Sequence, residues 1–345
     1  MRVVHVNLAR GFRGGERQTL NLIDGLAGLG VEQALLCRNG SELSRRGGAL
    51  GLPIAEVAHP LLGHLRPPPA DIIHVHEARG AYWAAIEHAV RNTHYIITRR
   101  IPNPISRSGV TSAVYRCADR LAGVSNDVSM RLASQTGRAV QTILSATSAF
   151  AACPERVREI RARIGGGPIV GHVGALHDHH KGQSVLIEAF HQLLPEFPQA
   201  RLVLVGDGPD RQHFETLAKG DKRIVFAGFQ EEVGSWIAAM DVFGFPSREE
   251  GLGSSVMDAM ALGVPVVAAA VGGLPELIGA NERGLLVKDH EPASWCSSIR
   301  RMLIERAQHD NQVGAARQFS LCNDIAAMSQ RYMTLYEEVV HNMPA

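Results

Sequence analysis

The sequence predicts an α/β protein with two parallel-sheet domains. Short apolar runs typical of buried strands alternate with helix-like segments along the whole chain, which is the pattern of parallel α/β architecture. The chain has 345 residues, more than one hydrophobic core usually supports. The alternation breaks between residues 148 and 167, where Ala, Pro and Gly surround one polar helix. We therefore predict an N-terminal domain at residues 1–150 and a C-terminal domain at 151–320.

Predicted strands occur in both domains. In the first domain the apolar runs are residues 3–7, 33–36, 72–75, 95–98, 121–124 and 142–144. In the second domain they are residues 169–173, 201–205, 224–226, 242–245, 265–268 and 284–287. A last helix, predicted from about residue 321 to 340, carries apolar side chains near helical spacing. It forms a terminal segment, residues 321–345.

Composition excludes several classes of protein. The formal net charge of +1 argues against a nucleic-acid binder. The five cysteines are scattered without a Cys-x-x-Cys pair, which indicates reduced thiols rather than a disulfide framework or a zinc site. No stretch approaches the roughly twenty apolar residues that a membrane span needs, and the N-terminus reads as a strand rather than a signal peptide. We expect a cytoplasmic protein.

Charge is divided unevenly between the domains. Residues 1–150 contain seventeen arginines, no lysine and ten acidic residues, a balance of +7, and the remainder has a balance of −6. A basic domain raises the local concentration of anionic partners. It predicts a phosphorylated acceptor or peripheral contact with an anionic membrane. A solvated, arginine-rich surface is the alternative.

The most informative segment is residues 245–277. An apolar run there ends in a loop that carries Glu250, and a Gly-x-Gly turn ends at Gly253. Asp258 lies on the helix predicted next, and a buried strand follows at 264–268. In an open parallel sheet, such a loop lies in the crevice where ligands bind, and the first N–H groups of the helix face an anion there.

This segment resembles the donor-sugar motif of glycosyltransferase family 4, retaining enzymes of the GT-B fold that include lipopolysaccharide core glycosyltransferases. Further segments are similar to family blocks in the same order: residues 13–17, 171–182, 203–209 and 225–229. The resemblance implies two Rossmann-like domains that face a central cleft. It assigns the acceptor to residues 1–150 and the nucleotide sugar to 151–320. It also implies that the helix in 321–345 crosses back to the N-terminal domain.

The transfer reaction needs positive groups that stabilise charge on the leaving phosphate. The resemblance assigns this role to Lys181, which precedes a predicted helix whose N-terminus adds partial positive charge. Glycine-rich turns let backbone N–H groups approach an anion. The expected backbone contributors are Gly14, Gly15, Leu252, Gly253, Ser254 and Ser255. The alternatives are a surface lysine at 181 and an ordinary turn at 14–15.

The two carboxylates of the donor motif have different expected roles. By resemblance, Glu250 accepts hydrogen bonds from hydroxyls of the donor sugar. Asp258 accepts them from the ribose of the nucleotide. Without the surrounding motif, two acids near a helix N-terminus would indicate only capping and favourable interaction with the helix dipole.

His76 is a further candidate catalytic residue. It follows the predicted strand 72–75, and strand alternation places it on the same face as His74. The pair His76-Glu77 resembles the family's His-Glu at this position, where it would orient the acceptor or the donor sugar. A structural histidine bonded at the strand end is the alternative. Arg99 and Arg100 follow the next strand and suit an anionic acceptor, although loop arginines are often only solvated.

The run of histidines and Asp178 at residues 177–180 has the composition of a metal site. Consecutive loop residues seldom converge on one ion, so we expect no metal there and regard assistance to the diphosphate as the alternative. Two positions depart from the family pattern, Ala175 for Arg and Asp258 for Glu. Both fall on the donor site. They leave open an unusual donor, or a nucleotide-sugar-binding protein with weak or no catalysis.

We expect a retaining glycosyltransferase that moves a sugar from a nucleotide diphosphate to a hydroxyl of a surface glycan, with lipopolysaccharide core the acceptor indicated by resemblance. No covalent nucleophile, cofactor or metal is expected, and the nucleotide sugar is the donor substrate. A dinucleotide-dependent oxidoreductase would need Gly-x-Gly-x-x-Gly after a strand, which neither 13–16 nor 206–209 supplies. A non-catalytic glycan- or nucleotide-binding module is the third hypothesis.

Overall fold

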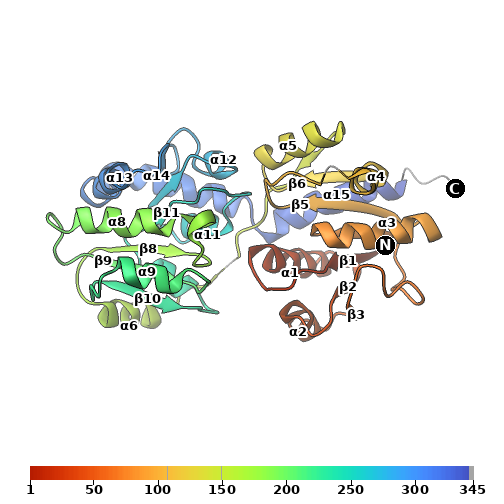
Figure 1. The fold of residues 1–345 in the computed structure, drawn as a ribbon, viewed down its shortest axis with the longest axis horizontal. Coiled ribbons are helices and arrows are strands. Elements are labelled where there is room, and N and C mark those ends of the chain that lie inside the picture. Colours follow the sequence, from red (N-terminus) through yellow and green to blue (C-terminus); the bar gives the residue numbers. More distant parts are fainter. Residues whose placement is uncertain (107, 149, 342–345) are drawn as a thin grey trace. The chain divides into compact units, whose positions relative to one another are not determined.

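A computed structural model of the protein describes residues 1–106, 108–148 and 150–341. The chain divides into two compact units (Figure 1). The first unit contains Met1–Ser148 and Asn323–Ala345, and the second contains Ala149–Cys322. The C-terminal segment thus belongs to the first unit, although it follows the second in the sequence. Residues 342–345 of the predicted terminal segment, and residue 149 beside the predicted boundary, lie outside the described residues.

The first unit is built on a seven-stranded parallel sheet. Its strands are β1 (Arg2–Asn7), β2 (Glu32–Arg38), β3 (Ile54–Val57), β4 (Ile72–Val75), β5 (His94–Arg99), β6 (Arg120–Gly123) and β7 (Gln141–Thr142). They pair in the order β3-β2-β1-β4-β5-β6-β7, so that β1 and β4 are neighbours at the centre. The central strands are buried along nearly their whole length, as expected for a parallel sheet covered on both faces.

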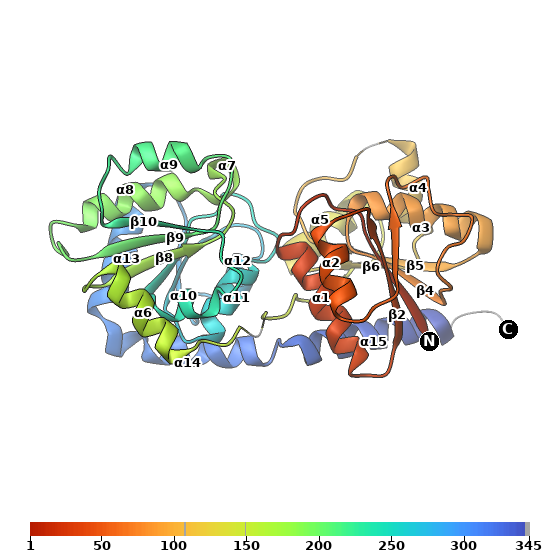
Figure 2. The same cartoon turned by 90° about the horizontal axis from the view of Figure 1, so that it is seen from below.

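Helices cover this sheet on both faces. They are α1 (Gly14–Ala27), α2 (Glu42–Ala49), α3 (Ala78–Arg91), α4 (Gly109–Cys117), α5 (Asn126–Thr136) and α15 (Ile325–His341). The helix α15 lies beside α1 (Figure 2). Its Tyr332 and Tyr336 share one hydrophobic cluster with Leu22 of α1 and with Ile72 and Ile96 of the sheet. The C-terminal helix is therefore part of the core of the first unit.

The second unit repeats this design with a six-stranded parallel sheet. Its strands are β8 (Ile169–Val173), β9 (Arg201–Val205), β10 (Ile224–Gly228), β11 (Val242–Phe245), β12 (Val266–Ala269) and β13 (Leu285–Val287). Their order is β10-β9-β8-β11-β12-β13, with β8 and β11 adjacent. Its helices are α6 (Pro154–Ile164), α7 (Asp178–Lys181), α8 (Gln183–Leu193), α9 (Arg211–Leu217), α10 (Gly234–Ala238), α11 (Ser254–Ala261), α12 (Leu274–Ile278), α13 (Pro292–Ile304) and α14 (Arg306–Leu321).

The predicted fold class is confirmed, with corrections at particular elements. The strands at 72–75, 169–173, 201–205 and 242–245 have the predicted bounds. Strand β3 was not predicted, because it lies at the sheet edge, includes a glutamate, and has only Val57 fully buried among its four residues. The last helix begins at Ile325 rather than near 321, since α14 occupies the sequence up to Leu321.

None of the helices within the described residues combines the length and the apolar character that a membrane crossing requires.

Candidate active site

The topology gives each sheet one point where ligands are expected. In the first unit, the chain leaves β1 toward one edge of the sheet and later leaves β4 toward the other. The strands β8 and β11 have the same relation in the second unit. Crevices at the carboxyl ends of such strand pairs are the usual ligand sites of open α/β sheets. The residues predicted from the sequence follow these four strands.

Lys181 and Glu250 form an ion pair in the second unit. Lys181 ends α7, in the connection after β8, and Glu250 lies in the loop after β11. The lysine Nζ is 2.5 Å from Oε2 of Glu250, and the two side chains are 22% and 15% exposed. Lys181 is thus partly buried and paired with a carboxylate, and its role at the leaving phosphate remains a prediction. The structure brings the predicted phosphate-binding cation and the predicted sugar-binding carboxylate together.

Several contacts hold this pair in place. The Nζ of Lys181 lies 4.9 Å from the ring centroid of Phe245, within the range of a cation–π interaction. The Oγ of Ser247 donates to Oε2 of Glu250 at 3.4 Å. The N–H of Gly251 donates to Oε1 of the same carboxylate at 3.2 Å. The lysine and the carboxylate are consequently oriented before any ligand is bound.

Two glycines allow the backbone segments of this site to approach one another. Gly182 follows Lys181 with φ +63°, and a Cβ there would collide with the carbonyl oxygen of Pro246. Gly272 follows β12 with φ +54°, and a Cβ there would collide with the carbonyl oxygen of Glu250. Only glycine suits both the positive φ and the close contact. Gly272 is absent from the predicted site, although it lies within the segment 245–277.

The predicted backbone donors of the second unit lie at the start of α11. Leu252 is buried, Gly253 is the N-cap, and Ser254 and Ser255 are the first two helical residues. The first turn of a helix carries N–H groups without intrahelical partners and a partial positive charge. Asp258 is the fifth residue of the same helix and is 6% exposed. Its ribose-binding role remains a prediction.

The segment at residues 177–180 stabilises the local fold. Both carboxylate oxygens of Asp178 accept hydrogen bonds from Ser184 in the first turn of α8, one from its N–H and one from its hydroxyl, each at 2.8 Å. The ring of His180 lies 3.3 Å from the carboxylate of Glu249. The carbonyl of Ala175 accepts from Nε2 of Gln183 at 2.7 Å, and its methyl group supplies no cation. Lys181 is therefore the cation that this connection offers.

Gly14 and Gly15 are the first two residues of α1 rather than an ordinary turn. The helix is stabilised at its N-terminus by Glu16, whose Oε2 accepts from the N–H of Arg13 at 2.8 Å. A Cβ added to Gly15 would lie 3.6 Å from Cδ of Arg100. The predicted glycine segment after β1 thus lies near the side chain of an arginine that follows β5.

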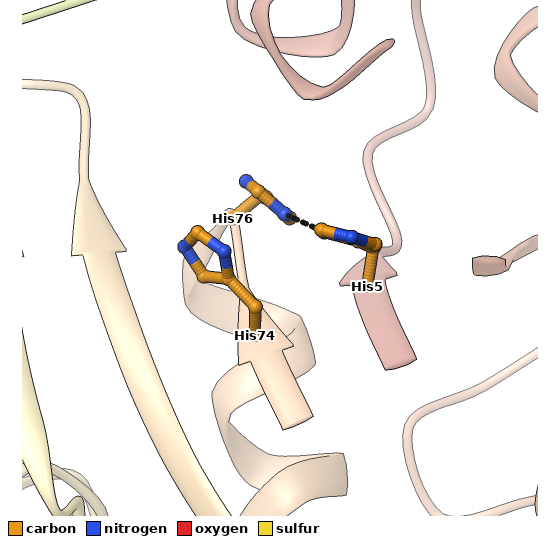
Figure 3. Close-up of side chains that lie close together, drawn as sticks. All are labelled: His5, His74 and His76. Atoms are coloured by element: carbon orange, nitrogen blue, oxygen red, sulfur yellow. Dashed lines mark hydrogen bonds between the residues drawn. The ribbon is translucent and has the colours of Figure 1, made fainter. Parts of the chain in front are cut away.

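His76 connects Arg100 to a chain of hydrogen bonds. The guanidinium NH2 of Arg100 lies 3.2 Å from Nδ1 of His76. Because arginine only donates, Nδ1 accepts and the ring proton of neutral His76 is on Nε2. That nitrogen lies 3.0 Å from Nδ1 of His5 (Figure 3). The Nε2 of His5 in turn donates to Oε1 of Gln33 at 2.9 Å, and Gln33 donates to the carbonyl of Ile23.

The two histidines in this series of hydrogen bonds, His5 and His76, are uncharged near neutral pH. Burial is the main cause that lowers the pKa of His5 to about 4. Burial, with the neighbouring His74, His5 and Arg100, holds the pKa of His76 well below its usual value. Both ring nitrogens of His76 have hydrogen-bond partners. Its contacts within the first unit are therefore those of a structural histidine bonded at a strand end. Its remaining route to a substrate is through Arg100.

His5, His74 and His76 have the composition of a metal-binding cluster, since one ring nitrogen of each lies within 4.8 Å of the others (Figure 3). Their hydrogen bonds do not favour a cation. Both nitrogens of His74 are bonded, to the hydroxyl groups of Tyr336 and Thr98, each at 2.7 Å. The positive charge of the guanidinium at Nδ1 of His76 would also repel a metal ion.

Other residues of this site were missed because their partners are far away in the sequence. His5 and Gln33 are buried polar residues on β1 and β2 that read as parts of apolar runs. For His5 and Gln33, the only sequence signal was a polar side chain within an otherwise apolar strand. Glu77, noted in the sequence as part of the His-Glu pair, accepts from the N–H groups of Arg79, Gly80 and Leu8, so it caps α3 and ties that helix to the end of β1.

Comparison with known proteins decides the family. Residues 167–305 match the family described as Glycosyl transferases group 1. The chain is 30% identical over 283 residues to a 2-deoxystreptamine glucosyltransferase from Streptomyces kanamyceticus, an alignment that covers 73% of each chain. The chain belongs to the glycosyltransferase group 1 family, glycosyltransferase family 4. It is a nucleotide-sugar-dependent glycosyltransferase of a retaining family.

Further members and fold neighbours of this glycosyltransferase vary in their partners. A D-inositol 3-phosphate glycosyltransferase from Corynebacterium efficiens is 37% identical over 185 residues, 49% of this chain and 42% of that protein. Anabaena HepE in complex with UDP-glucose has a TM-score of 0.84 at 20% identity, covering 99% of this chain and all of that one. The apo lipopolysaccharide outer core galactosyltransferase WaaB has a TM-score of 0.72 at 14% identity, with 99% and 100% coverage. The two structures establish the GT-B fold.

Proposed function

We propose that this glycosyltransferase moves a hexose or related sugar from a nucleotide diphosphate to a hydroxyl group of a surface glycan, with lipopolysaccharide core as the acceptor. The observation that carries the donor half of this proposal is the ion pair of Lys181 and Glu250 after the two central strands of the second unit. The family supplies the class of reaction. The likeness to WaaB and the basic balance of residues 1–150 favour an anionic surface glycan as the acceptor.

Each residue of the donor site has a chemical task in this proposal. Lys181 transfers its ionic contact from Glu250 to the diphosphate, whose charge grows as the bond between the sugar C1 and the phosphate oxygen breaks. Glu250 then accepts hydrogen bonds from sugar hydroxyls. Asp258 binds the ribose. The N–H groups at Gly253, Ser254 and Ser255 face the phosphates at the N-terminus of α11.

The reaction proceeds on one face of the sugar and so retains configuration. The acceptor oxygen forms a bond to C1 while the C1–phosphate bond breaks, and the acceptor proton passes to the leaving phosphate oxygen. No residue acts as a covalent nucleophile in this scheme. His76 acts by positioning rather than by proton transfer, since its ring is buried, neutral and bonded at both nitrogens. No cofactor or metal ion is assigned to the reaction.

We place the enzyme in the cytoplasm, with peripheral contact between its basic first unit and the inner face of an anionic membrane. A membrane-attached glycolipid acceptor would be accessible from that location. Sedimentation with vesicles that contain anionic lipid tests this placement, and loss of sedimentation at high salt is expected because the attraction is electrostatic.

A weakly catalytic nucleotide-sugar-binding protein is the second candidate. Ala175 stands where the family has an arginine, and one cation fewer at the diphosphate favours this alternative. The two candidates agree on donor binding and differ on turnover. Release of nucleotide diphosphate with the wild-type enzyme, at a rate that depends on acceptor concentration, would exclude the second candidate.

A thermal-shift screen of UDP, GDP, ADP and their sugars tests the proposed donor class directly. A ligand that binds the folded state raises the unfolding temperature. The increase grows with the ratio of the ligand concentration to its Kd. At least one nucleotide and its sugar should stabilise the wild-type protein. The same ligand should stabilise Lys181→Ala less. The donor assignment is wrong if none of these nucleotides and nucleotide sugars changes the midpoint.

A further inference from the structure

Arg100 is a cation held in the first unit by neutral groups. Its NH1 donates to Oγ of Ser145 at 3.3 Å, and its NH2 donates to Nδ1 of His76 at 3.2 Å. Its Nε is buried and has no hydrogen-bond partner within the described residues. Among those same residues, no carboxylate lies within ion-pair distance of the guanidinium. Burial accordingly lowers the pKa of Arg100.

Other arginines of this unit are arranged differently. Arg91 pairs with Glu87 at 2.9 Å, and Arg131 pairs with Asp127 at 2.7 Å. Arg99, the neighbour of Arg100, donates to the carbonyl of Asn103 at 2.6 Å and is itself buried. The two adjacent arginines that suit an anionic acceptor therefore differ. Arg99 bonds to its own loop, and Arg100 lacks an anionic partner within the described residues.

An arginine in this state is costly to the folded protein. A cation removed from water requires a counter-ion or a full set of hydrogen bonds, and a buried donor without an acceptor lowers the stability of the folded state. The acidic residue with an electrostatic effect on Arg100 is Glu16, whose carboxylate is already bonded to the N–H of Arg13. Within the described residues, the guanidinium of Arg100 therefore has neutral hydrogen-bond partners and no carboxylate of its own.

A second anion-binding feature lies next to this cation. Gly15, which lies near the Arg100 side chain, is the second residue of the fourteen-residue helix α1. The N–H groups of its first turn and the partial positive charge of the helix end favour an anion. Arg100 and Gly15 both remain partly exposed, so an anion can reach them from solvent.

We propose that Arg100, together with the first turn of α1, binds a phosphate group carried by a substrate of the transfer reaction. The planar guanidinium offers several donors in a fixed arrangement that fits phosphate oxygens, which an ammonium group does not. The bonds from His76 through His5 to Gln33 hold the acceptor atom of His76 in place and thereby orient the guanidinium. His76 is a positioning residue for this site.

The inference rests on the proposed function for the identity of the phosphate, which belongs either to the donor diphosphate or to a phosphorylated acceptor. The chemistry of recognition is the same for both. UDP carries the donor's phosphates without an acceptor, whereas inorganic phosphate represents either source. Binding of the two probes to variants of Arg100 therefore distinguishes the sources.

The test measures binding of inorganic phosphate and of UDP to the full-length protein by calorimetry at fixed ionic strength. The variants are Arg100→Met, which keeps side-chain length without charge, and Arg100→Lys, which keeps charge without the planar fork. Lys181→Ala removes the binding contributed by the second unit. The matched control is Arg131→Met, which removes one positive charge from an exposed ion pair of the same unit.

We expect Arg100→Met to weaken phosphate binding roughly 10- to 100-fold, the scale of losing charged hydrogen bonds. Arg100→Lys should give an intermediate loss, and Arg131→Met should bind phosphate like the wild type. A parallel loss of UDP affinity identifies the donor as the source. Unchanged UDP affinity identifies a phosphorylated acceptor. Wild-type phosphate affinity in Arg100→Met, or no phosphate binding to the wild type, overturns the proposal.

Thermal stability separates this role from a structural one. If Arg100 is kept for binding, the unliganded Arg100→Met protein should melt at the wild-type temperature or about 2–4 °C higher, because a poorly satisfied charge is removed. A clear decrease in the midpoint would instead mark Arg100 as a structural residue and contradict the proposal. The phosphate measurement requires no sugar transfer. Arg100-dependent binding without any transfer activity would therefore reject the proposed function alone.

Discussion

Each unit has a cation just after one strand of its sheet, Arg100 after β5 and Lys181 after β8, and the two cations are in opposite electrostatic states. In the second unit, Lys181 is paired with Glu250 at 2.5 Å. In the first unit, Arg100 is held by Ser145 and His76, both neutral. A paired cation must exchange its partner when an anion binds, so the carboxylate is released to contact another part of the ligand. A cation without a counter-ion needs no exchange and gains the full interaction with the incoming charge.

One architecture can therefore hold its cations in two different ways. Both units use a parallel sheet in which the chain leaves two neighbouring strands in opposite directions. The side chains that follow the strands then determine whether a cation is paired with a carboxylate, as Lys181 is, or bonded only to neutral groups, as Arg100 is.

Lys181→Ala should have the largest effect. Loss of one preorganised electrostatic donor lowers the rate of transfer by roughly two or more powers of ten. Steady-state release of nucleotide diphosphate measures this rate. Lys222→Ala removes an exposed lysine of the same unit and should keep wild-type turnover. Near-normal turnover in Lys181→Ala would assign the phosphate to other groups, such as the ring of His180.

Lowering the pH should decrease the stability of the first unit through its buried histidines. The pKa of His5 is about 4 in the folded protein and about 6.5 in the unfolded chain, so only the unfolded chain takes up a proton between those values. Stability is complete above about pH 6.5 and decreases as the pH falls toward 4, by about 3 kcal/mol for a shift of this size. Urea unfolding at several pH values measures the loss.

His5→Gln should flatten this pH dependence, although it lowers stability at pH 7. His172 of the second unit is likewise buried and also has a pKa of about 4, so His172→Gln should flatten the acid response of that unit in the same way. His213→Gln replaces an exposed histidine and serves as the control. An acid response in His5→Gln that equals the wild-type response would show that the buried ring is not the group that titrates.

Asp258→Ala should weaken binding of the nucleotide diphosphate roughly 10- to 150-fold, since a hydrogen bond to a charged acceptor contributes about 1.5–3 kcal/mol. Asp258→Glu restores the family's residue and should bind as well as the wild type or better, provided that the longer side chain fits this buried position. Calorimetry measures both. Asp221→Ala, in a surface ion pair with Arg223, is the control. Wild-type affinity in Asp258→Ala would rule out the ribose contact.

The fold was largely predictable from the sequence because its signals are local. Buried parallel strands such as β4, β8 and β11 are continuous apolar runs, and their bounds follow from the residues alone. The edge strand β3 lacks that signal, since its short sequence contains Glu56 and is only partly buried.

The site was predictable only where a motif identified it. Lys181 and Glu250 were found by resemblance, but their mutual ion pair depends on two loops 69 residues apart in the sequence. The bonds of His76 to Arg100 and His5 likewise join three different strands of the sheet. Contacts of this kind follow from strand order and register, which a single sequence does not display.

The most direct test of the account is calorimetric titration of Glu250→Gln with the nucleotide diphosphate and the nucleotide sugar that stabilise the wild type. The substitution removes the charge that pairs with Lys181 and weakens contact with sugar hydroxyls. Glu249→Gln, at the neighbouring exposed glutamate, is the control. Glu250→Gln should bind the free nucleotide diphosphate within about threefold of the wild type and the nucleotide sugar roughly tenfold or more weakly. Equal weakening of both ligands, or no change in either, would contradict the assignment of Glu250 and Lys181 to the donor sugar and its diphosphate.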